Sequence, residues 1–142
     1  ILDDVGIVWI VELAARLSGG YFSSHTIPLS MGWNVVKDAV LIASGRKPIL
    51  EFTRQEPCHV TQRYIFPRKD MIGKKIVQLL DFRHSDNTKL VTFNYKEGDV
   101  IREVKSHPDR LGQTIVVGKD EFETQNLAES AVEAMVRGMK VE

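Results

Sequence analysis

The stretch that most constrains the fold runs from Ile7 to Phe22 and reads IVWIVELAARLSGGYF. Its apolar run predicts a strand over Val5–Ala15 that is covered on both faces. Glu12 interrupts this run, and burying its carboxylate without a partner would be costly. Arg16 and the Gly19–Gly20 pair follow in a small, polar segment, which predicts a long loop over residues 16–30. These residues indicate an anion- and metal-binding loop, although a solvated acid and base without function would give the same pattern.

Composition places the chain among soluble globular proteins. Its 142 residues are 43% hydrophobic and 27% charged, enough for one domain or two small ones. The formal net charge is zero and no apolar run approaches the roughly 20 residues of a membrane-spanning helix. We therefore expect no nucleic-acid partner, no membrane partner and a cytoplasmic location. The single cysteine, Cys58, excludes an internal disulfide and a cysteine-based zinc site.

Periodicity predicts an α+β fold. We expect a helix from about Met31 to Ser44, capped by Ser30 and stopped by Gly45. Its apolar face would contain Val35, Val36, Ala39, Val40 and Ala43. Further along, the pattern predicts strands at 59–66, 74–82, 89–95, 100–104 and 113–117, with the third and fourth forming a hairpin through a turn at 96–99. A final helix capped by a D-x-x-E box would run to about residue 137. We place a domain boundary near residue 50, which separates 1–50 from 51–142.

Two patterns in the sequence resemble ligand-binding motifs but lack the spacing that those motifs require. Residues 112–119 (GQTIVVGK) space their glycines one residue too far apart for a phosphate loop, and Asp120 stands where that motif needs Ser or Thr. These glycines also flank an expected strand instead of opening a helix. The four histidines are far apart with no paired spacing, so the sequence gives no support for metal ligation by them.

Residues 12–20 (ELAARLSGG) resemble the last core strand and following loop of ATP-grasp ligases, where the usual pattern is acid–x–Asn–x–Arg. The expected helix ending in ASG at 43–45 is similar to the helix that follows in those enzymes. The segments GD (98–99) and HPDRLG (107–112), with the next strand and helix, resemble the small C-terminal domain of ATP-grasp carboxylases and amino-acid ligases. The resemblance implies the end of an ATP-grasp core, as strand, loop and helix, followed by a small antiparallel-sheet domain with a C-terminal helix.

The loop sequence discriminates among members of the superfamily. Biotin carboxylases continue after the arginine with Val-Glu-His-Pro, and glycinamide ribonucleotide synthetases carry Gly-Asp-Pro-Glu; this chain has neither. Carbamoyl phosphate synthetases continue Arg-x-Ser-Arg, of which Ser18 is present while Gly19 replaces the second arginine. The glycine pair resembles L-amino acid (dipeptide) ligases and their carbamoyl-phosphate-synthase-like relatives.

This resemblance implies a carboxylate–amine (or carboxylate–thiol) ligase that uses ATP and works through an acyl phosphate. Glu12 would bind the nucleotide through Mg²⁺ or Mn²⁺, and Arg16 would be the catalytic residue that clamps the transferred phosphoryl group. The Gly19–Gly20 pair would bring backbone N–H groups to the bound cofactor and substrate carboxylate. Ser18 and His25 would line the acceptor pocket.

Ala14 departs from this pattern, because it stands where the family has a metal-coordinating asparagine. The family's nucleotide-gripping lysines are also not visible, so we expect the chain to be a C-terminal fragment that is inactive alone and binds ATP and Mg²⁺ only with an upstream portion. Its expected partners are a small-molecule carboxylate, an amine and the rest of the same polypeptide; a homodimer stays open. Two alternatives remain: a non-catalytic ATP-grasp-like binding or assembly module, which Ala14 favours, and an ATP-grasp enzyme of the purine or carbamoyl phosphate type.

Overall fold

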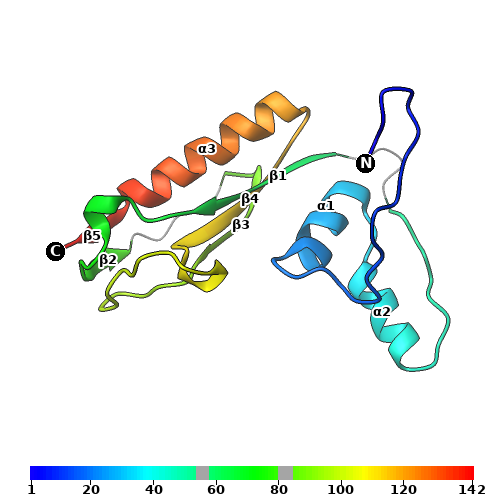
Figure 1. The fold of residues 1–142 in the computed structure, drawn as a ribbon, viewed down its shortest axis with the longest axis horizontal. Helices are drawn as coiled ribbons and strands as arrows, with labels where there is room; N and C mark the ends of the chain where they lie inside the picture. The colour runs from blue at the N-terminus through cyan, green and yellow to red at the C-terminus, as the bar shows by residue number, and fades with distance from the viewer. Residues whose placement is uncertain (54–57, 80–84) are drawn as a thin grey trace.

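The structure, a computed structural model, describes residues 1–53, 58–79 and 85–142. It combines helices with antiparallel sheets, which confirms the predicted α+β class (Figure 1). The α-helices are α1 (Ile27–Met31), α2 (Val35–Ala43) and α3 (Glu121–Arg137). The strands are β1 (His59–Ile65), β2 (Ile76–Leu79), β3 (Thr88–Phe93), β4 (Gly112–Gly118) and β5 (Met139–Val141). Short helical turns are η1, a π-helix (Phe22–Thr26), and two 3₁₀ turns, η2 (Lys69–Met71) and η3 (His107–Asp109).

The main sheet has the strand order β1-β4-β3, with both pairs antiparallel. In β1 and β4 the register runs from His59 opposite Gly118 to Ile65 opposite Gly112. Strands β2 and β5 form a separate antiparallel pair. Helix α3 lies along one face of β1 and β4 (Figure 1). The side chains of the main hydrophobic core are Ile65, Met71, Ile76, Ile101, Leu111, Met135 and Met139.

Helix α3 confirms the prediction for the C-terminal segment. Its N-cap Asp120 accepts a hydrogen bond from the Glu123 backbone N–H at 2.8 Å. The return bond of the expected capping box is displaced by one residue, because the Glu123 carboxylate accepts from Lys119 N at 2.7 Å. Ala128 and Met135 are buried on this helix, together with the hydroxyl-bearing Thr124.

The predicted hairpin between strands 89–95 and 100–104 is wrong. The turn forms, with Asp99 N donating to Lys96 O at 3.1 Å, but β3 pairs with β4 instead. Residue Ile101 explains the difference. Its buried side chain joins the main core, and its backbone exchanges hydrogen bonds with residues 73 and 74, from Ile101 N to Lys74 O at 2.9 Å and from Gly73 N to Ile101 O at 2.8 Å. The strand expected over 74–82 forms at 76–79, and residues 80–82 lie outside the described residues.

The helix expected over Met31–Ser44 starts later, at Val35. Gly32 has φ +69°, which ends the preceding helix α1, and Asn34 replaces Ser30 as the N-cap by accepting from Lys37 N at 3.0 Å. The predicted stop is confirmed, since Gly45 adopts φ +73° directly after the helix.

The buried face of α2 also differs from the predicted apolar face. Asp38 and Leu41 are its buried residues, whereas Val40 is 63% exposed. The Asp38 carboxylate accepts hydrogen bonds from Trp33 Nε1 at 2.8 Å, Ile49 N at 2.8 Å and Leu50 N at 3.0 Å. These donors, the Trp33 indole first, hold the pKa of Asp38 below its ordinary value. A charged side chain with three donors thus joins α2 to the chain segment that returns beside it.

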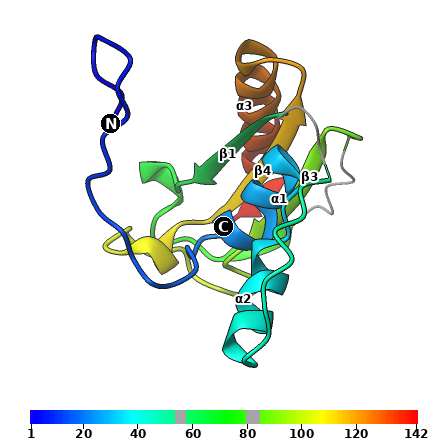
Figure 2. The ribbon, with the colours of Figure 1, turned by 90° about the vertical axis from the view of Figure 1, so that its right-hand side faces the viewer.

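The buried strand predicted over Val5–Ala15 is wrong. Residues 1–9 form a turn closed by one antiparallel bridge between Leu2 and Val8, and the chain then continues as an extended arm that stands apart from the main sheet (Figure 2). Val11 and Leu13 are 76% and 85% exposed. A strand is stabilised by hydrogen bonds to a neighbouring strand, and no described segment pairs with residues 10–15.

Candidate functional site

Glu12 lies on this arm, Arg16, Ser18, Gly19 and Gly20 lie in the loop that follows it, and His25 lies in η1. Glu12 is exposed, and its carboxylate accepts no hydrogen bond from the described residues. Arg16 is also exposed, and its guanidinium Nη1 donates to the neighbouring Leu17 carbonyl at 3.3 Å. Ser18 and Gly19 are exposed as well. The side chains of Glu12, Arg16 and Ser18 are thus open to solvent, and no hydrogen bond or ion pair of the described residues joins them to one another.

The loop expected over 16–30 ends earlier than predicted. The Tyr21 carbonyl accepts hydrogen bonds from His25 N at 2.9 Å and Thr26 N at 3.1 Å, which starts η1. Pro28 lies in the first turn of α1, where a missing N–H removes no helical hydrogen bond. His25 is therefore helical and half-buried, with its ring 5.2 Å from the Tyr21 ring and its Nδ1 2.9 Å from Ser24 Oγ.

Gly20 is the residue of the loop that contacts the sheet. It has φ +65° and is followed by Tyr21 at φ +70°, so two consecutive residues are left-handed. The Gly20 carbonyl accepts a hydrogen bond from Gln62 Nε2 at 2.8 Å. A Cβ atom added to Gly20 would lie 3.4 Å from the Tyr64 hydroxyl oxygen. Strand β1 therefore holds Gly20 through the hydrogen bond from Gln62, and Tyr64, on the same face of the strand, lies close to Gly20.

The same contact reaches β4. Gln62 Nε2 also donates to the side-chain carbonyl of Gln113 at 2.8 Å, and Gln113 is buried. The opposite face of these two strands carries α3. The loop that follows Glu12 and Arg16 is thus attached to the central strand of the three-stranded sheet.

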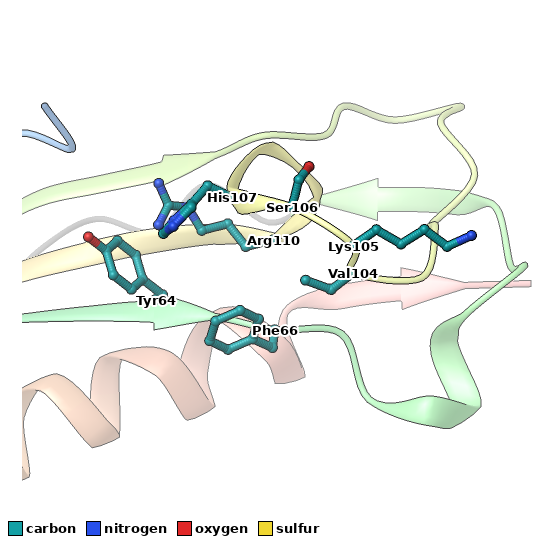
Figure 3. Close-up of a pocket in the computed structure, with 7 residues that line it drawn as sticks. All are labelled: Tyr64, Phe66, Val104, Lys105, Ser106, His107 and Arg110. Carbon is teal, nitrogen blue, oxygen red and sulfur yellow. The ribbon is translucent and has the colours of Figure 1, made fainter.

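A cavity of about 320 Å³ lies next to this attachment (Figure 3). Tyr64 belongs to both, because its hydroxyl end is near Gly20 while Arg110 stacks on its ring, with Cζ 3.9 Å from the ring centroid. The residues that line the cavity are Tyr64, Phe66, Val104, Lys105, Ser106, His107 and Arg110.

A capping box shapes the loop that carries Arg110. The Asp109 carboxylate accepts from Ser106 Oγ at 2.8 Å, Ser106 N at 2.8 Å and Lys105 N at 3.1 Å. These bonds, the Ser106 hydroxyl first, hold the pKa of Asp109 below its ordinary value. The Asp109 carboxylate is therefore bonded within its own turn. The next residue, Arg110, follows the turn, and its side chain lies over the Tyr64 ring.

Sequence reasoning did not select Tyr64, Phe66 or Arg110 as site residues. Two signals pointed to them: the aromatic residues at positions 64 and 66 share one face of a predicted strand, and the S-x-x-D spacing of Ser106 and Asp109 is that of a capping box just before Arg110. Neither signal reveals that the strand and the loop meet, because they are more than 40 residues apart in the sequence.

A metal ion could use Glu12 as one ligand. Within residues 1–53, 58–79 and 85–142 there is no group of three or more His, Cys, Asp or Glu side chains placed to hold a metal. Mg²⁺ in nucleotide sites keeps several waters and takes one or two carboxylates together with substrate phosphates. A single exposed carboxylate free of hydrogen bonds from the described residues fits that role, and further ligands would come from elsewhere.

Comparison with known proteins finds a matching family model and matching solved structures. Residues 74–136 match the family model of L-amino acid ligase C-terminal domain 2. The whole chain superposes on the crystal structure of phosphoribosylglycinamide synthetase from Anaerococcus prevotii with a TM-score of 0.74 and 20% identity, so this likeness shows the fold. The match covers 100% of this chain and 35% of that one. A search of curated proteins gave no match.

No helix in the described part of the chain combines the length and apolar character needed to cross a membrane. The family match spans β2, β3, β4 and α3 up to residue 136, and the fold match spans the whole chain. Together they are consistent with the C-terminal part of an ATP-grasp ligase.

Proposed function

We propose that the chain forms one wall of the active site of a ligase that joins a carboxylate to an amine, or to a thiol, at the expense of ATP. The observation that carries this proposal is the attachment of the Gly19–Gly20 loop to Gln113 through Gln62. Gln113 belongs to the segment that matches the L-amino acid ligase model. The loop with the ligase-like residues Glu12 and Arg16 is therefore fixed to the part of the chain with ligase-like sequence.

In this chemistry the substrate carboxylate takes the terminal phosphoryl group of ATP, and the amine then displaces phosphate to give an amide. Arg16 would orient the phosphoryl group, because a planar guanidinium donates two parallel hydrogen bonds to such oxygens. Its present bond to the Leu17 carbonyl is long, at 3.3 Å, and the side chain is exposed. Arg16 is thus free to change partners when an anion binds.

Glu12 would hold the Mg²⁺ that neutralises charge on the phosphates, and the Gly19–Gly20 backbone would donate N–H groups to the nucleotide or the carboxylate. Ser18 and His25 would lie on the acceptor side of the pocket. We also propose that this chain packs against the rest of a longer polypeptide. The apolar side chains of residues 7–13 are exposed, and such a contact would cover them. The division into parts 1–50 and 51–142 and the cytoplasmic location belong to the same proposal.

The second candidate is a non-catalytic binding or assembly module with the same fold. Ala14 favours it, because an alanine supplies no oxygen to a metal. The two candidates differ in what the full polypeptide does with ATP.

The experiment uses a polypeptide that contains this chain together with the nucleotide-binding part, assayed for ATP-dependent amide formation across a panel of amino acids. We expect Glu12→Gln and Arg16→Ala each to lower kcat/KM by about 100-fold or more, as loss of a phosphate-stabilising group does. The matched controls are Glu51→Gln and Arg46→Ala, which are exposed and outside the loop. Near-normal activity in both site variants would refute the site, and no amide formation by the unmodified polypeptide would favour the module.

A further inference from the structure

We propose that the cavity between β1 and the loop 104–110 is a binding site for a small carboxylic acid with an apolar body. The residues that line it come from β1, from Phe66 and from the loop 104–110, and they include neither Glu12 nor Arg16. Its volume of about 320 Å³ is that of a small-molecule site. The proposal is separate from the ligase function, because it concerns binding to this chain alone.

The apolar wall comes from two aromatic rings. Tyr64 and Phe66 are two residues apart and lie on the same side of the extended chain, facing the loop (Figure 3). Val104 extends this wall from the loop side. Phe66 is 56% exposed, although a large ring of this kind is usually better buried. A ligand with an apolar body would cover it.

The charged group of the site is Arg110. Its guanidinium lies on the Tyr64 ring, with Cζ 3.9 Å from the ring centroid. Stacking occupies one face of the planar group and leaves the N–H donors at its edge available for a bidentate bond to a carboxylate. No carboxylate of the described residues lies within 4.0 Å of Arg110. The stacking also restricts the side chain before a ligand arrives, so less entropy is lost on binding.

The neighbouring charges favour a monoanion over a phosphate. Lys105 lines the cavity with its stem, while its ammonium points away from the other lining groups and lies 3.9 Å from the Glu103 carboxylate (Figure 3). Asp109, the acid that precedes Arg110 in the sequence, accepts hydrogen bonds from the backbone of its own turn. His107, beside Arg110, adds a ring nitrogen that can donate a hydrogen bond. One full positive charge faces the cavity, which matches one carboxylate.

The test is a titration of the isotope-labelled 142-residue chain with 3-phenylpropanoate, followed by backbone amide shifts in NMR. The comparison probes are 3-phenylpropanamide, which lacks the charge, and acetate and inorganic phosphate, which lack the apolar body. Arg110→Gln removes the charge and keeps the stem, and Phe66→Ala removes one wall. Lys96→Gln is the matched control, because it changes the charge by the same amount at an exposed residue that does not line the cavity. The dispersion of each spectrum shows whether the variant is folded.

We expect saturable shifts confined to β1 and residues 104–110 with 3-phenylpropanoate. Arg110→Gln and Phe66→Ala should each weaken binding by about tenfold or more, and Lys96→Gln by less than about twofold. The amide and acetate should bind at least about tenfold more weakly than the acid. Shifts that map elsewhere, an Arg110→Gln variant that binds like the unmodified chain, or phosphate that binds as well as 3-phenylpropanoate would each overturn the proposal.

Discussion

Gly112 is the position at which a single added methyl group should be most damaging. A Cβ atom there would lie 2.0 Å from the Thr92 carbonyl oxygen, 3.0 Å from the Thr92 carbonyl carbon and 3.2 Å from Phe93 Cα. All three are backbone atoms of β3, so no side-chain rotation relieves the contact. The strands β3 and β4 approach this closely because Gly112 pairs with Phe93 at the start of β4. Arg110 lies two residues before it, so a displaced strand would also disturb the Arg110–Tyr64 stack.

The expected loss follows from these distances. Overpacking in a protein interior costs about 1–3 kcal/mol and more where the backbone must move. We therefore expect Gly112→Ala to lower the free energy of unfolding by about 3 kcal/mol or more. With an m-value of about 2 kcal/mol per molar urea, the unfolding midpoint would fall by about 1.5 M.

The measurement is urea unfolding followed by far-UV circular dichroism. Alanine variants at two other glycines serve as comparisons. A Cβ at Gly19 meets nothing within 4 Å, so Gly19→Ala should change the stability by less than about 0.5 kcal/mol. A Cβ at Gly118 lies 2.9 Å from side-chain atoms of Glu123 and Thr124, which can shift, so Gly118→Ala should fall between the two. If the midpoint of Gly112→Ala matched that of Gly19→Ala, the close approach of β3 and β4 would be refuted.

Three further outcomes are expected. Asp120→Ala removes the N-cap bond to Glu123 N and should lower the free energy of unfolding by about 1 kcal/mol in the same assay; an unchanged value would contradict the cap. The pKa of Asp109 is lowered by the Ser106 hydroxyl, so this carboxylate contributes stability above its unfolded pKa, near 3.8, and loses the contribution as the pH falls through the lower folded value. Ser106→Ala should therefore lose less stability than the unmodified chain between neutral pH and about pH 3, and an identical loss would exclude this linkage. The chain alone, with Mg²⁺, ATP and amino acids, should release no phosphate above background in a colorimetric assay, and measurable release would show that it carries a complete site.

The C-terminal half of the fold was predictable because its signals are local. Helix α3 follows from an N-cap at Asp120 and apolar residues such as Ala128 and Met135 at helical spacing. Strands β1 and β4 follow from short runs ended by Pro67 and Gly118. Each element could be assigned from fewer than 20 consecutive residues.

The errors arose where a segment depends on distant partners. Residues 100–104 looked like the second strand of a hairpin, but burial of Ile101 in the core brings them to residues 73–76. The apolar run over 7–13 looked like a buried strand, but an apolar run alone does not supply a neighbouring strand. In α2 the burial of Asp38 depends on donors at Ile49 and Leu50, which periodicity within the helix does not indicate.

The candidate site, like the fold, was predictable only where its signals are local in the sequence. Of the predicted glycine pair, Gly19 has no positive φ, whereas Gly20 takes φ +65° and so occupies a special backbone conformation. Its contacts with Gln62 and Tyr64 were not predictable, because they join positions about 40 residues apart. Arg110 was noted only as part of a resembling segment, and its place on the Tyr64 ring depends on how the loop and β1 meet.

The proposed ligase function requires that the substrate carboxylate is activated as an acyl phosphate. The most direct measurement uses the polypeptide that contains this chain and the nucleotide-binding part, with a substrate labelled by oxygen-18 in its carboxylate. Because phosphate leaves with one carboxylate oxygen, mass spectrometry should find one labelled oxygen in each released phosphate, and Arg16→Ala should lower the rate at which labelled phosphate forms by about 100-fold or more. Amide formation with unlabelled phosphate would contradict the claim.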